Sequence, residues 1–146
     1  QAENYLRWDS LGEFLALAVS LEHYSEHTGN QQARIMGQCL DDATTRFLDE
    51  DKSPTRRLGG IDNRGSHFYL ALYWAEALAA QTEDAELKAD FSTLASSLKT
   101  AESAVIEELI SVQGTPADIG AYYRPDAKKA QKIMRPSATL NKILSQ

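Results

Sequence analysis

The sequence predicts an all-α fold, a bundle of about six helices around one helix that is apolar on nearly all sides. Apolar residues recur at helical spacing along most of the 146 residues, and no stretch alternates in the way that a half-buried strand does. Hydrophobic residues make up 42% of the chain, which is enough for a packed core within one domain. The absence of an alternating pattern excludes a free-standing dinucleotide-binding sheet in this chain.

The first two helices are predicted over about residues 10–28 and 31–49. Gly29 lies between them and suits the left-handed conformation that commonly ends a helix. Ser10 and Glu13 have the spacing of a capping box, in which both side chains bond to free backbone N–H groups. The second helix should keep a polar face in water, formed by Asp41, Asp42, Thr45 and Asp49.

An irregular stretch is expected over residues 51–65, because it contains Pro54 and three glycines. We interpret the adjacent Gly59 and Gly60 as a flexible corner. The same stretch is locally basic in a chain of net charge −6, through Arg56, Arg57 and Arg64.

The third predicted helix, over residues 66–81, is the one that is apolar on most sides. A helix of this kind needs cover all round, so we expect further chain to supply part of that cover. Beyond it, the pattern predicts a helix after residue 84, another over 101–113, and two short helices over 126–134 and 137–144. Asp126 and Ser137 are natural N-caps for the short helices.

Charge and composition exclude several classes of function. A net charge of −6 argues against nucleic acid as the main partner and against a polybasic membrane contact. No apolar run approaches the roughly 20 residues that a membrane-spanning helix needs. Cys39 is the only cysteine, so an internal disulfide and a thiolate zinc site are excluded, and a reducing compartment such as the cytoplasm is expected. Since the chain opens on Gln1, we expect a piece of a larger intracellular protein without a complete catalytic site.

Possible metal and acid–base groups have simpler explanations. His23 and His27 have the spacing of two ligands on one helix face, but histidines near a helix C-terminus also stabilise its dipole. Neighbouring carboxylates on a helix diverge by about 100°, so Asp41-Asp42 and Glu107-Glu108 are expected to be solvated. We therefore predict neither a metal site nor a catalytic group in this chain.

Arg7, Trp8 and Asp9 stand immediately before the first predicted helix. Free N–H groups at a helix start attract anions, and a guanidinium can stack on a flat ring or pair with a phosphate. A flat cation, a flat ring and a carboxylate acceptor could together bind a nucleotide. Ordinary capping beside an Arg–Asp pair is the alternative.

Arg56 and Arg57 follow a Ser-Pro-Thr turn in the irregular stretch. Arginines after a rigid turn can clamp a phosphate through bidentate hydrogen bonds. The alternative is two solvated arginines. The hypothesis of a nucleotide site requires Arg7 and Arg56 to lie in adjacent segments, and their separation in the fold tests it.

The same residues give the chain a resemblance to a known family. It resembles the C-terminal region of the monomeric-type NADP-dependent isocitrate dehydrogenases along essentially its whole length. A run as long as the 13 residues from Asp62 to Trp74 is hard to explain by chance. The similar stretches are Leu6–Leu17, Lys52–Arg56, Asp62–Trp74, Val112–Gly114, Asp118–Gly120 and Met134–Thr139.

The resemblance implies an enzyme that decarboxylates isocitrate oxidatively to 2-oxoglutarate with NADP and Mg²⁺ or Mn²⁺. In such enzymes two domains face each other across the active-site cleft, and the smaller combines both ends of the chain. Residues 1–146 would be the C-terminal helical portion of that discontinuous domain, without its N-terminal part. Expected partners are isocitrate, NADP and the rest of the parent chain, with no nucleic acid or membrane; the parent is expected to be monomeric.

By the same resemblance, Arg7, Trp8, Asp9 and Arg56 would contact NADP, with Arg56 near its 2′-phosphate. The metal ligands, the isocitrate-binding groups and the catalytic residues would lie outside this chain. The isolated piece is then expected to be inactive, to expose apolar surface and to tend to self-associate. The rival hypothesis is a non-enzymatic helical module that recruits a partner helix.

Overall fold

The computed structural model describes residues 2–146, which form helices and connecting segments without a β-strand. The prediction of an all-α fold is confirmed. The six helices are α1 (Leu11–Thr28), α2 (Gln31–Asp49), α3 (Asn63–Ala80), α4 (Ala85–Ser111), α5 (Ala127–Met134) and α6 (Ala138–Ile143).

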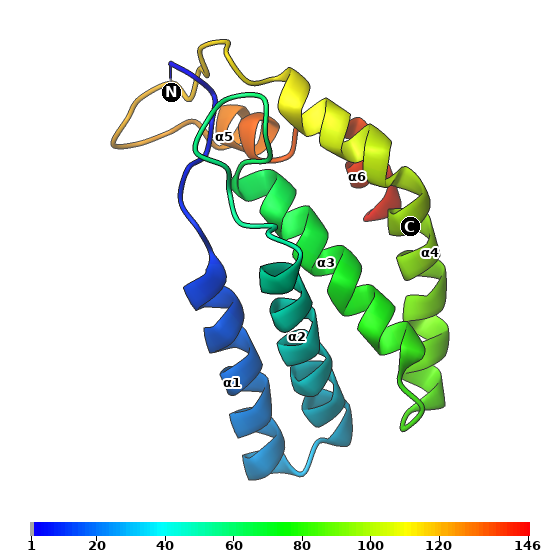
Figure 1. Cartoon of the computed structure of the whole chain (residues 1–146). Coiled ribbons are helices and arrows are strands. Elements are labelled where there is room, and N and C mark those ends of the chain that lie inside the picture. The colour runs from blue at the N-terminus through cyan, green and yellow to red at the C-terminus, as the bar shows by residue number, and fades with distance from the viewer. Residues whose placement is uncertain (1) are drawn as a thin grey trace.

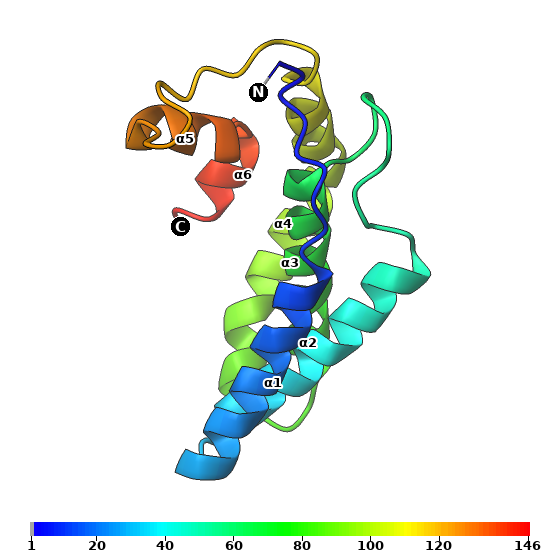
Figure 2. The same ribbon diagram turned by 90° about the vertical axis from the view of Figure 1, so that its left-hand side faces the viewer.

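The four long helices lie side by side in the order of the sequence, while α5 and α6 lie at one end (Figures 1 and 2). Each long helix packs on the next, and α6 packs on α4. The helices therefore form a row, with α3 in its interior, rather than a closed ring. None of them, within the described residues, is both long and apolar enough to cross a membrane.

The first two helices have the predicted bounds, and Gly29 adopts the left-handed conformation with φ 70°. The predicted capping box at Ser10 is wrong. Ser10 is buried, and its Oγ accepts a hydrogen bond from Nδ2 of Asn63 at 2.9 Å. The carboxylate of Asp9 accepts from the backbone N–H of Leu11 instead, at 3.1 Å. A tertiary partner has taken the hydroxyl that the local pattern assigned to the helix start.

Helix α3 begins three residues earlier than predicted, because Asp62 caps it by accepting from the N–H of Arg64 at 2.9 Å. The two helices predicted after residue 84 are one continuous helix, α4. No glycine or proline interrupts residues 85–111, and apolar side chains on both sides of the expected break are buried together, among them Leu98 and Val105. The caps predicted at Asp126 and Ser137 are confirmed.

The core lies where α3 meets α2 and α4. Its largest fully buried side chains include Phe47, Phe68 and Leu72. Within residues 2–146, α3 is covered on most sides, and His67 and Ala71 form part of its exposed stripe. Helix α1 carries four of the exposed large apolar residues, Leu15, Leu17, Val19 and Tyr24.

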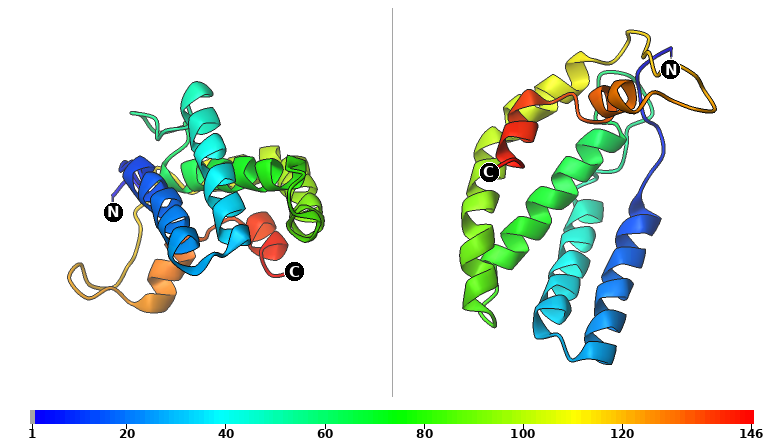
Figure 3. Two further views of the ribbon diagram at one scale, coloured as in Figure 1. Left: turned by 90° about the horizontal axis from the view of Figure 1, so that it is seen from below. Right: turned by 180° about the vertical axis from the view of Figure 1, so that it is seen from behind.

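The segment before α1, the loop of residues 50–62 and α5 gather at one end of the long helices (Figure 3). The acidic face of α2 is exposed as predicted. All four residues expected to contact a nucleotide belong to the first two of these segments, so that end holds the candidate site.

Candidate functional site

The segment before α1 is fixed to the start of α3 by hydrogen bonds from a buried asparagine. The N–H of Asn63 donates to the carbonyl of Leu6 at 2.8 Å, and its Nδ2 donates to the carbonyl of Trp8 at 2.9 Å. The N–H of Leu6 donates in turn to Oδ2 of Asp62 at 3.3 Å. These bonds hold the main chain on both sides of Arg7. Sequence reasoning missed Asn63, since nothing in the helical periodicity distinguishes it.

Tyr5 fixes the same segment to the loop of residues 50–62. Its hydroxyl lies 2.5 Å from the carbonyl oxygen of Thr55, 2.6 Å from Oγ1 of Thr55 and 3.0 Å from the carbonyl oxygen of Ile61. The tyrosine is buried, with 9% of its surface exposed. The guanidinium carbon of Arg7 lies 4.7 Å from the centre of its ring, within the range of a cation–π contact.

Arg7 joins the two arginine-bearing segments directly. Its Nη1 donates to the carbonyl oxygen of Arg56 at 2.8 Å, and its Nη2 forms an ion pair with Glu3. The two segments therefore lie side by side, as the nucleotide hypothesis requires. Both arginines are exposed. Within residues 2–146, the guanidinium of Arg56 forms no ion pair, so its charge is open to an incoming anion.

Trp8 and Asp9 complete the predicted set. Trp8 directly follows Arg7 in the chain and is 49% exposed, so part of a large flat ring faces solvent. Asp9 is exposed, and one of its carboxylate oxygens caps α1. All four residues are exposed, and they are absent from the lining of the cavities described below.

The loop that carries Arg56 is held by hydrogen bonds at several points, including Gly59 and Gly60, the pair interpreted above as a flexible corner. The N–H of Thr55 donates to the carbonyl of Ile61 at 2.8 Å, which closes the loop. A Cβ on Gly60 would lie 2.3 Å from Oγ1 of Thr55, so only glycine fits there. The side chain of Gln113 bonds to Gly59 and Gly60 from the end of α4, at 2.9 Å each.

Arg64 does not belong to the exposed basic loop, contrary to prediction. It is 5% exposed and forms a buried ion pair with Asp62, with Nη2 2.6 Å from Oδ2. Its guanidinium also donates to the carbonyl oxygens of Asn4 and Ile133, each at 2.8 Å. It therefore connects α3, the segment before α1 and the end of α5. The spacing of Asp62 and Arg64 was the one signal in the sequence that could have suggested this.

Glu108 likewise departs from the expected solvated face. Its carboxylate accepts from the hydroxyls of Ser137 and Thr139, at 2.6 Å each, and from the N–H of Thr139 at 3.1 Å. The side-chain hydrogen bonds from Ser137 and Thr139 lower the pKa of Glu108 below its ordinary value. This carboxylate attaches the start of α6 to α4, whereas its neighbour Glu107 is exposed.

A family model described as monomeric isocitrate dehydrogenase matches residues 1–145. The chain belongs to the monomeric isocitrate dehydrogenase family. It is 58% identical over 145 residues to the NADP isocitrate dehydrogenase 2 of Colwellia maris, which covers 99% of this chain and 20% of that protein. This membership favours the enzyme hypothesis over the rival hypothesis of an interaction module.

Two further relatives show the same extent of similarity. The NADP isocitrate dehydrogenase of Azotobacter vinelandii is 56% identical over 143 residues, covering 98% of this chain and 19% of that protein. The NADP isocitrate dehydrogenase 2 of Mycobacterium tuberculosis is 53% identical over 142 residues, covering 97% of this chain and 19% of that protein. The chain thus spans about a fifth of the length of the curated relatives that it matches.

A metal of the kind expected for this family does not fit the residues described here. Within residues 2–146, no three His, Cys, Asp or Glu side chains lie close enough together to hold an ion. His23 and His27 are adjacent, but Nδ1 of His27 lies 3.0 Å from the carbonyl oxygen of His23. We therefore derive no chemical step through a metal in this member of the family.

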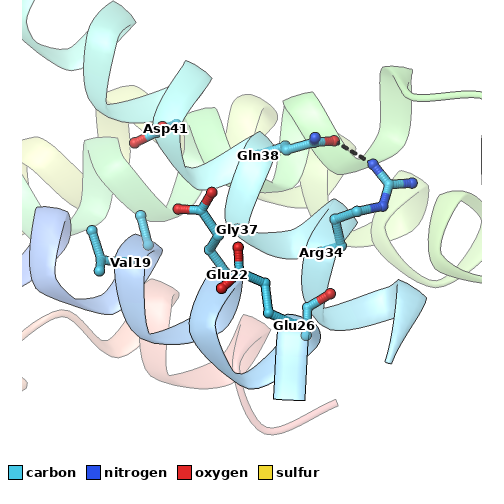
Figure 4. Close-up of a pocket in the computed structure, with 9 residues that line it drawn as sticks. Val19, Glu22, Glu26, Arg34, Gly37, Gln38 and Asp41 are labelled. Carbon is cyan, nitrogen blue, oxygen red and sulfur yellow. Dashed lines mark hydrogen bonds between the residues drawn. The ribbon is translucent and has the colours of Figure 1, made fainter. Parts of the chain in front are cut away.

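Two cavities between the helices do not suit a phosphorylated nucleotide. One of about 210 Å³ lies between α1 and α2 (Figure 4), where Glu22, Glu26 and Asp41 would repel a phosphate. The arginine beside it, Arg34, is paired with Glu83. A second cavity, of about 430 Å³, lies between α3, α4 and α6 and is mostly apolar. Compared with these two cavities, the exposed surface around Arg7 and Arg56 is the better candidate for binding a phosphate.

Proposed function

We propose that the protein to which this chain contributes converts isocitrate and NADP to 2-oxoglutarate, CO₂ and NADPH. The relatives that match at 51–58% identity are named as NADP isocitrate dehydrogenases. Because the chain spans about a fifth of their length, it would supply only part of the cofactor site, and the isolated chain would be inactive. The rest of the polypeptide and the two substrates are the partners in this proposal.

The contact between Arg7 and Arg56 is the observation that carries the proposal. The bond from Nη1 of Arg7 to the main-chain carbonyl of Arg56 brings together two exposed segments that each carry a permanently charged side chain, and Arg7 is also paired with Glu3. The 2′-phosphate of NADP is close to a dianion, and guanidinium groups bind phosphates through paired hydrogen bonds. Trp8 would offer a flat surface for stacking, and Asp9 an acceptor.

NADP, when bound, would accept the hydrogen at C2 of isocitrate with its electron pair, while the hydroxyl at C2 loses its proton and the resulting keto acid then loses CO₂. In this proposal the chain's own part is to bind and orient the phosphorylated end of the cofactor. We assign the catalytic groups and the Mg²⁺ or Mn²⁺ site to the remainder of the protein.

The exposed apolar residues of α1 support a proposal about the parent domain. Leu15 and Val19 are 46% and 62% exposed, on a helix that packs mainly on α2. We infer that residues 1–146 form the C-terminal portion of a discontinuous domain whose other segments cover this face.

The single cysteine, Cys39, is buried and unpaired, which suits a reducing compartment such as the cytoplasm.

Replacing Arg56 in the full-length protein tests the role of the surface. Arg56→Ala should raise the KM for NADP by about tenfold or more, because a charge-assisted contact to phosphate is lost. The KM for isocitrate should stay within about twofold, since that substrate does not reach this surface. Arg57→Ala is the matched control, because Arg57 is equally exposed but is assigned no contact. Equal effects on both KM values, or none, would contradict the assignment of Arg56.

A further inference from the structure

Tyr5 touches both sides of the candidate NADP surface. We propose that it is a positioning residue that sets the placement of Arg7 relative to Arg56, and thereby the preference for a nucleotide with a 2′-phosphate over one without. The inference rests on the proposed function and deepens it. It adds a residue that determines cofactor specificity through its neighbours.

The hydroxyl of Tyr5 holds the loop that carries Arg56. It reaches two points of the loop that are six residues apart, Thr55 and Ile61, and it lies within hydrogen-bonding distance of three oxygen atoms there. The phenol can donate its proton to one carbonyl while it accepts from the hydroxyl of Thr55. Because Thr55 immediately precedes Arg56, these bonds fix the position of the backbone from which the side chain of Arg56 extends.

The ring of Tyr5 holds Arg7. The guanidinium carbon lies 4.7 Å from the ring centre, and the same guanidinium donates to the carbonyl of Arg56 at 2.8 Å. A long arginine side chain that is 48% exposed would otherwise sample many rotamers. Two guanidinium groups that are placed in advance bind one dianion more tightly than two that must be ordered on binding.

A substitution at Tyr5 can distinguish a role in positioning the arginines from a role in folding. The buried ring would remain in place in a Tyr5→Phe variant, and only the hydroxyl would be lost. The main chain on both sides of Arg7 would still be held by Asn63 and Asp62, through Leu6 and Trp8. We therefore expect the segment to stay attached and the loop of Arg56 to shift relative to it.

The test compares Tyr5→Phe with Tyr73→Phe in the full-length protein. Tyr73 is the matched control, because it is also buried and its hydroxyl donates to Glu50, the first residue of the same loop, rather than to the residues next to Arg56. Steady-state kinetics with NADP and with NAD give the cofactor preference as a ratio of kcat/KM values. Tyr5→Phe should raise the KM for NADP and lower the preference for NADP, each by about fivefold, with kcat and the KM for isocitrate within about twofold. Tyr73→Phe should leave all four within about twofold.

Three results would decide against the inference. A Tyr5→Phe variant that keeps its preference for NADP, while Arg56→Ala raises the KM for NADP, would make Tyr5 purely structural. Parallel changes in Tyr5→Phe and Tyr73→Phe would show a general effect of lost hydroxyls. An Arg56→Ala variant with an unchanged KM for NADP would contradict the proposed function itself, and the inference with it.

A second variant serves if Tyr5→Phe fails to fold. Thr55→Val removes one hydrogen-bond partner of the Tyr5 hydroxyl and should also lower the preference for NADP.

Discussion

Arg64 and Asp62 form an ion pair in which 3% and 0% of the two side chains are exposed, beneath the segment that carries Arg7. Taking such charges out of water is unfavourable unless every polar atom finds a partner. Here the guanidinium also bonds to main-chain carbonyls of Asn4 and Ile133, and the carboxylate also caps α3. The candidate surface therefore depends on a buried network that connects three separate parts of the chain.

We predict that Arg64→Met lowers the free energy of unfolding by about 3–5 kcal/mol, because the carboxylate of Asp62 is left buried without its partner. The double variant Asp62→Asn with Arg64→Met should recover part of this loss, since asparagine still caps α3 and no charge remains. Urea unfolding of the full-length protein, followed by circular dichroism, measures the free energy of unfolding of both variants. Arg34→Ala breaks an exposed ion pair with Glu83 and should cost much less. A double variant no more stable than Arg64→Met would contradict this account.

The close approach of Gly60 to Thr55 gives a second prediction. In Gly60→Ala the new methyl would lie 2.3 Å from Oγ1 and 2.7 Å from Cγ2 of Thr55, so the loop must move. Because Thr55 immediately precedes Arg56, this movement should raise the KM for NADP severalfold. The melting temperature of the variant should also be lower. Gly12→Ala is the control for stability. It meets nothing within 4 Å on α1 and should leave the melting temperature unchanged or raised. An unchanged KM for NADP in Gly60→Ala would show that the loop position does not matter for the cofactor.

Acid should weaken the attachment of α6 to α4 through Glu108. The hydrogen bonds from Ser137 and Thr139 favour the carboxylate, so the pKa of Glu108 is lower in the folded protein than in the unfolded chain. The stability that these bonds contribute is thus fully present above the unfolded pKa, and it is lost as the pH falls through the lower folded pKa.

We therefore expect Glu108→Gln to reduce stability at neutral pH and to flatten the fall in stability below about pH 4. Unfolding measured between neutral and acidic pH checks this. Glu107→Gln is the matched control, because Glu107 is the exposed neighbour and should leave the pH profile unchanged. An identical acid profile in Glu108→Gln and the parent protein would rule out this role.

The sequence by itself determined most of the helices and several of their ends, although it divided α4 in two and began α3 three residues late. Apolar spacing located α1 and α2 to within one residue, and Gly29, Asp126 and Ser137 marked termini that the structure confirms. These signals are local, because a helix forms and ends through groups within one or two turns. The resemblance of several stretches to one family was also readable from the letters alone, and the family match confirms it.

Only the tertiary structure decided what the polar side chains do. Ser10, Arg64 and Glu108 were expected to cap, to lie in an exposed loop and to be solvated, and each instead bonds to a distant part of the chain. Tyr5 meets Thr55 across 50 positions of sequence, and Arg7 meets Arg56 across 49. Partners this far apart are chosen by how the helices pack against each other. A hydroxyl or guanidinium bonds to whichever group the packing brings within about 3 Å, and no local pattern records which group that will be.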